Sequence, residues 1–460
     1  MTNGEAGRCG GLLTADAVQA MKTALAFLAE RDAAELTRLT GQTVESLALR
    51  SAPADKRSFP ASYGGGKPCD DDLLAGQGVF YVTQAGRLML DCTAGHYQMT
   101  WGYNHPDLAA IVDEGMGLGV VWDNHSNIPS LPVKVLAERL VDVVAGSGLD
   151  RVLLGTATGS VACAAALKIM IARYRADADR AAAGPPVILS LAGNYHGTDM
   201  VAQTLRGMWP GLLADLEPVQ VEPNDADDLR AAFNRFGSRV AGFWAEPIMM
   251  NREAIVVDAD YLRLARDLCT AHDALMAIDE IQTGFWYPEV FLFRRRGIAP
   301  DLVVFGKGLT AGFHPLAGLL FRKDLDILAQ YDAISTNGNA SLAALVGLGC
   351  VNLVQRRAAA IDALQTRWFT GLRAVADRHA DRIEEVNGDG LLTGLKFRDR
   401  DAALAFHRAA LDRGLWLRVH AYHPGHRTIL TKLALAADET VIDFVLGVLD
   451  DLLTRDFRGA

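Results

Sequence analysis

Two apolar runs in the middle of the chain end in residues that could do chemistry. Asp279 follows the run 275–278, and Lys307 follows the run 302–305 with a glycine on each side. A short apolar run that stops at a charged residue is typical of a buried parallel strand whose carboxyl end lies at a cleft. The carboxylate and the amine could neutralise each other, or they could hold the two ends of one cofactor. The flanking glycines favour the cofactor, because they leave room for a bulky group against the backbone.

Short apolar runs alternate with helical stretches from residue 105 to residue 325. Helices are expected at 131–145 and 161–176. Strands are expected at 151–154, 187–191, 240–244, 275–278, 302–305 and 316–321. This alternation predicts an α/β fold in which helices cover a mostly parallel sheet.

The two ends of the chain lack this alternation and predict a smaller α+β unit beside the sheet. The C-terminal part has a long helical segment at 340–380, strands at 391–397 and 415–419, and a final helix at 438–454. We therefore expect three parts. They are an N-terminal segment with leading helices and a hairpin over residues 1–95, a large cofactor domain over 96–335, and a C-terminal small domain over 336–460 that includes the linking helix.

Composition and charge exclude several classes of protein. The formal net charge is -10 and there is no Lys/Arg-rich tract, so we expect no nucleic-acid partner. No apolar run has the length of a membrane span, and the start does not read as a signal peptide, so we expect no membrane partner. The six cysteines are scattered without metal-binding spacing, which predicts free thiols, a cytoplasmic location and no metal site.

Several short motifs occur in an order that resembles one enzyme family. Along residues 75–350 the chain is similar to the class III (ornithine/GABA-type) aminotransferases, a branch of the fold-type I enzymes that use pyridoxal 5′-phosphate. The motifs are Thr158-Gly159-Ser160, Asn194-Tyr195-His196-Gly197, Glu246-Pro247, Asp279 with Gln282, and Lys307 with its glycines. The resemblance implies a mostly parallel seven-stranded sheet in the large domain, this cofactor, and a homodimer with shared active sites.

The resemblance also implies a role for each residue near the cofactor ring. Lys307 matches the lysine that forms a Schiff base with the cofactor aldehyde and then moves the α-proton. Asp279 matches the aspartate that keeps the ring nitrogen protonated. Gln282 matches the contact to the phenolic oxygen, and Glu246 matches a glutamate near the cofactor. The alternatives are a surface lysine, an aspartate in a plain ion pair or helix cap, a solvent-facing glutamine and a strand-end cap.

Two further motifs match the cofactor's phosphate and the face of its ring. Thr158-Gly159-Ser160 opens a helix, and small residues there expose backbone N–H groups to an anion. The family continues with acidic and amide residues, whereas this chain has Val161, Cys163 and Ala164 in their place. Tyr195 matches the aromatic residue that stacks on the ring, with a core tyrosine as the alternative. We expect His196 to be structural.

One motif matches a contact that crosses a dimer interface. Thr336, in Ser335-Thr336-Asn337-Gly338, is similar to the family threonine that binds the phosphate of the partner subunit. If it does so, the active site requires a dimer. The alternative is a cap for the helix that follows.

The candidate substrate contacts are an aromatic set and an arginine. Tyr97, Trp101 and Trp286 lie in segments that border the site in the family, although packing at a dimer interface explains aromatic residues equally well. The family often supplies a C-terminal arginine for a substrate carboxylate. Arg427 is the first candidate and Arg418 the second, and either could be a solvated surface arginine.

The expected function is transfer of an amino group from an amino acid or amine to a keto acceptor. A rival uses the same cofactor and fold for racemisation, decarboxylation or carbon–carbon bond formation, because the outcome depends on how the substrate is oriented. A further alternative is a binding or regulatory scaffold without activity. Neither the substrate nor an assembly beyond a dimer follows from the sequence.

Overall fold

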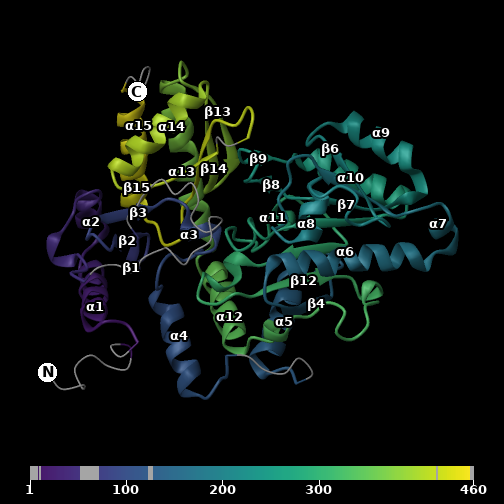
Figure 1. Ribbon diagram of the computed structural model, residues 1–460, viewed down its shortest axis with the longest axis horizontal. Helices are drawn as coiled ribbons and strands as arrows, with labels where there is room; N and C mark the ends of the chain where they lie inside the picture. Colours follow the sequence, from purple (N-terminus) through teal and green to yellow (C-terminus); the bar gives the residue numbers. More distant parts are fainter. Residues whose placement is uncertain (1–8, 10–11, 52–71, 123–127, 421–422, 456–460) are drawn as a thin grey trace.

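The structure is a computed structural model that describes residues 9, 12–51, 72–122, 128–420 and 423–455. Cys69 lies outside these residues. Figure 1 shows two parts side by side, a large sheet with helices packed along it and a smaller unit that contains both ends of the chain. The part that the structure describes therefore has the two-part α/β organisation expected from the sequence.

The large part is built on one seven-stranded sheet. Its order is β4 (Arg151–Thr156), β12 (Ala317–Phe321), β11 (Leu302–Phe305), β10 (Leu275–Asp279), β7 (Val240–Ala245), β5 (Val187–Leu191) and β6 (Glu217–Val221). Only β12 runs antiparallel to its neighbours, so the sheet is mostly parallel. The carboxyl ends of β10 and β11 consequently lie next to each other at one edge.

The five strands between the edge strands β4 and β6 are buried on both faces. In β10, alternate residues pack into two different cores. Leu275 and Ala277 of β10 pack with the helix α6 (Gly159–Ala176), whereas Met276 and Ile278 pack into the main core on the other face. Side chains of a strand alternate between faces, so Asp279 must project on the α6 side. The sheet thus fixes which helix faces the first candidate residue.

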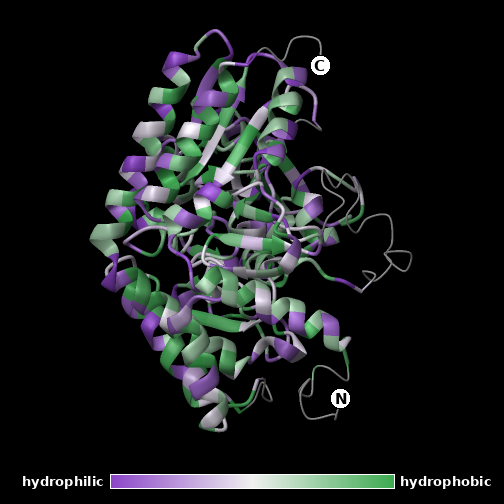
Figure 2. Cartoon of the chain, turned by 90° about the vertical axis from the view of Figure 1, so that its left-hand side faces the viewer, coloured by the Kyte–Doolittle hydropathy of each residue, from purple (hydrophilic) through white to green (hydrophobic). Residues whose placement is uncertain are grey.

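The other helices surround the sheet and form the smaller unit. In Figure 2 the helices at the surface mix hydrophilic and hydrophobic residues, as expected of helices with one buried side. Their bounds are α1 (Ala15–Ala29), α2 (Ala33–Leu39), α3 (Ala94–Tyr97), α4 (Pro106–Gly117), α5 (Leu131–Val143), α7 (Ala178–Ala182), α8 (Met200–Leu205), α9 (Ala226–Phe236), α10 (Ala259–Ala271), α11 (Leu292–Arg295), α12 (Ser341–Arg356), α13 (Ala358–Arg378), α14 (Arg400–Asp412) and α15 (Glu439–Leu453).

The smaller unit joins both ends of the chain through backbone pairing. One sheet has the order β1 (Leu73–Gln77), β2 (Phe80–Thr83), β3 (Leu88–Asp91) and β15 (Leu415–Trp416). The second has the order β13 (Ile383–Asp389), β14 (Leu392–Phe397), β17 (Thr428–Lys432) and β16 (Arg418–His420). Because β3 pairs with β15, the N-terminal hairpin belongs to the same unit as the C-terminal strands. The remaining pair is β8 (Ile248–Met249) with β9 (Ile255–Val256).

Three differences from the sequence-based prediction have physical causes. The strand β6 was not predicted, because it reads Glu-Pro-Val-Gln-Val and is a half-buried edge strand with no apolar run. The helical segment predicted at 340–380 is two helices, α12 and α13. The strand predicted at 415–419 is two short strands that pair in different sheets.

The stretch Thr336–Arg356 is long and apolar enough to cross a membrane by length and composition alone. In its most apolar window of 18 residues, 78% is buried inside the fold, and α12 packs against α4, α5 and the turn that carries Lys307. Its apolar character therefore reflects its place in the core.

Candidate active site

Lys307 begins a short 3-10 turn, Lys307–Thr310, directly after the buried strand β11. Its backbone is left-handed, with φ 36°, which is uncommon for a residue with a side chain. A Cβ atom on Gly308 would lie 2.6 Å from the Trp286 ring and 2.7 Å from Thr100 Oγ1. This glycine therefore makes room for the protein's own side chains, not for a ligand as we expected from the sequence.

The pKa of Lys307 is low for a lysine. Burial lowers it to about 8, while Asp279 and Glu246 act in the opposite direction and Arg418 adds to the lowering. An amine with this pKa is partly neutral near pH 7, and only the neutral form is a nucleophile or a base.

Asp279 is buried at the end of β10, on the α6 side of the sheet. His196 Nδ1 lies 2.7 Å from its Oδ2 atom, and Ile281 N donates to Oδ1 at 2.9 Å. Cys163 Sγ of α6 is 3.8 Å from the same Oδ2. His196 is fully buried and holds the carboxylate in a fixed direction, which is more specific than the general structural role expected for it.

Glu246 and Gln282 lie beside this carboxylate. Tyr195 N donates to Glu246 Oε2 at 2.8 Å, and Gln282 Nε2 lies 3.4 Å from Glu246 Oε1. Burial raises the pKa of Glu246 to about 7, with His196 acting against the rise and Asp279 adding to it. The same Gln282 Nε2 is 3.2 Å from Asn251 Oδ1. Gln282 Oε1 is buried and has no hydrogen-bond partner among the described residues.

The turn before α6 faces Lys307 across one pocket. The residues that line this pocket include Thr158, Gly159 and Lys307, together with His314 from the loop before β12. Thr158 is the N-cap residue, and its side chain does not cap the helix, so the first backbone N–H groups of α6 are open to a ligand. A Cβ atom on Gly159 would lie 2.6 Å from Ile281, which places this turn against the segment after Asp279.

Two tyrosines border the site from different directions. Tyr195 is half-buried, and the Arg206 guanidinium lies 5.8 Å from the centre of its ring. Tyr97 is buried, and its ring centre lies 5.8 Å from Lys307 Nζ and 5.6 Å from the Arg418 guanidinium. These contacts place Arg418, the second arginine candidate, next to Lys307.

For three of the predicted substrate contacts, Arg427, Trp101 and Trp286, the structure shows other partners than Lys307. The Arg427 guanidinium pairs with Glu384 at 2.5 Å, on the outer strand of the small sheet. Trp101 is fully buried, with its ring against His105. Trp286 is fully buried behind Gly308, and its Nε1 donates to Leu433 O at 3.3 Å. The two tryptophans are thus packed inside the subunit and Arg427 is in an ion pair, which differs from the interface packing and the solvated arginine named as alternatives.

Sequence reasoning missed two groups that the fold brings to the site. Lys432, at the end of β17, is completely buried and lies 5.5 Å from the Tyr97 ring centre. His96 lies next to the same ring, and burial, Lys307, Arg418 and Lys432 together lower its pKa to about 4. The sequence around Lys432 reads Thr-Ile-Leu-Thr-Lys, which has neither the continuous apolar run nor the flanking glycines that pointed to Lys307.

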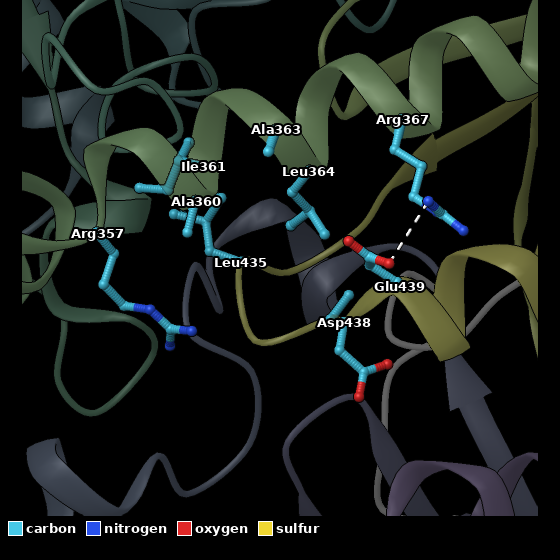
Figure 3. Close-up of a pocket in the computed structure, with 10 residues that line it drawn as sticks. Arg357, Ala360, Ile361, Ala363, Leu364, Arg367, Leu435, Asp438 and Glu439 are labelled. Atoms are coloured by element: carbon cyan, nitrogen blue, oxygen red, sulfur yellow. Dashed lines mark ion pairs between the residues drawn. The ribbon is translucent and has the colours of Figure 1, made fainter.

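A second hollow lies between α13 and the start of α15. Figure 3 shows its lining, in which Arg367 and Glu439 form an ion pair of 3.5 Å and the other side chains are mainly small or aliphatic. The described residues that line it include no Ser, Thr, Cys, His or Lys, and the raised pKa of Arg367 comes from its hydrogen bond to Asp443 at the surface. This hollow is therefore not a candidate active site.

The electrostatics of Lys307 predict a specific pH dependence. In cofactor-free protein, the rate at which an acylating reagent modifies Lys307 should have a midpoint near the pKa of about 8. Asp279 raises this pKa, so the Asp279→Asn variant should shift the midpoint to lower pH. Peptide mass spectrometry after short exposures to the reagent measures the rate at each pH. The exposed Asp260 of α10 provides a control, since Asp260→Asn should leave the midpoint in place. A midpoint near 10.5, the ordinary value, or a shift to higher pH in Asp279→Asn would contradict this electrostatic account.

The chain matches one protein family over most of its length. The family model "Aminotransferase class-III" matches residues 71–452. An ornithine aminotransferase from Emericella nidulans is 31% identical over 336 residues, covering 69% of this chain and 72% of that protein. An acetylornithine aminotransferase from Xylella fastidiosa is 30% identical over 345 residues, covering 71% of this chain and 79% of that protein.

Solved structures have the same fold. A transaminase from the marine bacterium Virgibacillus has a TM-score of 0.76 at 20% identity, covering 88% of this chain and 96% of that one. The ornithine aminotransferase of Toxoplasma gondii has a TM-score of 0.73 at 22% identity, with 85% and 94% covered. These findings confirm the predicted fold class, the pyridoxal 5′-phosphate cofactor and amino-group transfer. The chain belongs to the class III aminotransferases, a family of enzymes that depend on pyridoxal 5′-phosphate.

Proposed function

We propose that the protein moves an amino group from an amino acid to a keto acceptor, with Lys307 as the proton carrier and Arg418 as the contact to the substrate carboxylate. This proposal depends mainly on one observation. Lys307, a buried lysine with a lowered pKa, and Asp279, a buried aspartate with hydrogen-bond partners, lie at neighbouring strand ends. Ornithine and N-acetylornithine are the first donors to test, because the curated relatives are named for them.

The side chains of the site fit pyridoxal 5′-phosphate. Gln282 has a buried oxygen without a partner among the described residues, and α6 begins without a side-chain cap, so two places near Lys307 offer polar groups to a ligand. In our assignment Lys307 holds the aldehyde end, Asp279 the ring nitrogen and Tyr195 the ring face. Gln282 and Glu246 flank the ring, and Thr158, Gly159 and Ser160 hold the phosphate.

When it is bound, the cofactor supplies a carbon that accepts the amino group and a ring that withdraws electrons. The chain's own residues provide the rest. Lys307 Nζ takes the proton from the α-carbon of the donor, for which its neutral form is needed. His196 and Ile281 N hold the Asp279 carboxylate in place. Because both side chains are largely buried, Asp279 and Lys307 act in a medium where charges interact more strongly than in water.

Isotope transfer tests the reaction directly. Protein supplied with a ¹⁵N-amino donor and an unlabelled keto acid should place the label in the new amino acid, which mass spectrometry detects. Lys307→Ala should lose at least about a hundredfold in rate, the range for removal of a positioned base. Label that stays in a racemised, decarboxylated or carbon-extended donor would instead support the rival reactions. Unchanged activity of Lys307→Ala would contradict its role as the proton carrier.

The two arginine candidates are distinguished by paired variants. Arg418→Met should raise the KM for amino-acid donors at least about tenfold, since a charge-assisted contact of roughly 1.5–3 kcal/mol would be lost. Amine donors without a carboxylate should be affected little. Arg427→Met should leave both KM values near those of the wild type, because Arg427 pairs with Glu384. Steady-state kinetics with matched donors measures the difference, and the opposite ranking would move the carboxylate contact to Arg427.

The proposal includes a homodimer with shared active sites. It also includes a cytoplasmic location and domain boundaries near residues 95 and 335. Thr336 is exposed at its own subunit's surface, and the turn that carries it is bonded to Gly155 beside the phosphate loop. Large apolar side chains are exposed around the end of α4 and the start of α5, among them Leu118, Ile128 and Leu131. An apolar surface of this kind supports a protein partner. The described cysteines are free, which suits a reducing compartment.

Mixed dimers test the shared site. Thr336→Ala and Lys307→Ala should each be weakly active alone. If Thr336 serves the partner subunit, a mixed dimer has one site with both native residues, so mixing the two variants under conditions of subunit exchange should restore up to about half of the wild-type activity per dimer. Size-exclusion chromatography with light scattering verifies the dimer. No recovery from a verified mixed dimer would place Thr336 in its own subunit's site.

A further inference from the structure

Lys432 is the last residue of β17, and its side chain is 0% exposed. The amine of a lysine is rarely buried, because leaving water is unfavourable unless hydrogen bonds and favourable electrostatics replace its hydration. Burial, with a contribution from the charge on Lys307, lowers the pKa of Lys432 well below its ordinary value. Contacts inside the fold must therefore compensate the amine of Lys432 for the hydration that it loses.

The amine of Lys432 has a full set of partners. Its Nζ donates to the backbone carbonyl of Gln282 at 2.5 Å and to that of Tyr97 at 3.1 Å. It also lies 3.5 Å from the centre of the Trp286 ring, in the position of a cation–π contact. Two carbonyl oxygens and one aromatic face thus surround the amine of Lys432.

These partners belong to segments that are distant in sequence and that border the active site. The Tyr97 ring faces Lys307, and the Gln282 side chain lies beside Glu246. Lys432 comes from the small sheet, so its amine joins that sheet to both walls of the pocket. If the backbone carbonyl of Tyr97 or of Gln282 changed its direction, the side chain of that residue would be reoriented as well.

The segment before Tyr97 needs such support. Tyr97 has φ 62° and Ala94 has φ 47°, both in the left-handed region that residues with side chains rarely adopt. Such conformations persist only when surrounding contacts hold them. Lys432 holds this segment twice, because its backbone N donates to Cys92 O at 2.7 Å while its Nζ donates to Tyr97 O.

We propose that Lys432 is a positioning residue of the amino-transfer site, which fixes the directions of Tyr97 and Gln282 by binding their backbone carbonyls. This inference rests on the proposed function and adds to it a requirement for a second buried lysine. Lys432 acts through Tyr97 and Gln282 and forms no bond with the substrate.

The test compares Lys432→Met with a matched control in the full-length protein. Methionine keeps the length of the side chain and removes its donors. Lys396→Met is the control, since Lys396 lies on the neighbouring strand β14 and pairs with Glu384 away from the pocket. Hydrogen exchange of the cofactor-free protein, the visible absorbance of the bound cofactor and steady-state kinetics are measured for each. Lys432→Gln, which keeps a shorter donor, provides a second variant if methionine prevents folding.

We expect faster hydrogen exchange at residues 93–102 and 281–286 in the Lys432 variant, with strand β4 unchanged. The cofactor absorbance should shift, and kcat should fall at least about tenfold while KM for the donor changes less than about threefold. Lys396→Met should match the wild type in all three measurements. Lowered thermal stability with unchanged exchange in these segments, unchanged absorbance and unchanged kcat would overturn the proposal. If the wild type itself transfers no amino group, the proposed function fails, and the exchange measurement still tests whether Lys432 holds these segments.

Discussion

The site depends on one physical constraint: ionisable groups taken out of water must find partners inside the protein. Asp279, Glu246, Lys307 and Lys432 are all largely or completely buried, and Lys307 is within electrostatic reach of the other three. Water no longer stabilises their charges, so each is held by neighbours or has its pKa shifted towards the neutral form. Glu246 and Lys307 are shifted in this way, to about 7 and about 8, which is the range in which proton transfer near neutral pH is efficient.

The same constraint explains why the fold joins segments from the whole chain at this point. The parallel sheet delivers Asp279 and Lys307 on adjacent strands, while α6 places its open first turn against them. The C-terminal sheet of the smaller unit then contributes Arg418 on β16 and Lys432 on the neighbouring strand β17. A site of this composition requires the large and small parts to pack together, so its geometry depends on contacts between residues that are hundreds of positions apart.

Local sequence carried the information about the framework of this site. Apolar runs that stop at Asp279 and Lys307 predicted two strand ends, and the comparisons confirm the fold and the family that the motif order indicated. The individual roles of Lys307, Asp279, Gln282, Tyr195 and Thr336 remain predictions. A hydrophobic pattern shows where a strand ends, because it depends on residues only a few positions apart. It does not show what the residue at that end binds.

Contacts made by tertiary packing were not available from the sequence. His196 touches Asp279 across 83 positions, and Lys432 touches Gln282 across 150. The aromatic residues Trp101 and Trp286 were ambiguous for another reason, since a large aromatic ring suits a dimer interface as well as a substrate pocket, and core packing was not considered. Both are fully buried in the structure. For the arginines, the sequence left both candidates open, and only tertiary contacts distinguish them: Arg427 pairs with Glu384, whereas Arg418 lies beside Tyr97 and Lys307.

The central claim is that Lys307, and no other amine, holds the aldehyde end of the cofactor. Borohydride reduction of the cofactor-loaded protein fixes the cofactor permanently to the amine that carries it, and peptide mass spectrometry identifies that residue. We predict the added mass on the peptide that contains Lys307 and its loss in Lys307→Ala. Added mass on the other buried amine, Lys432, or on a surface lysine would contradict the account.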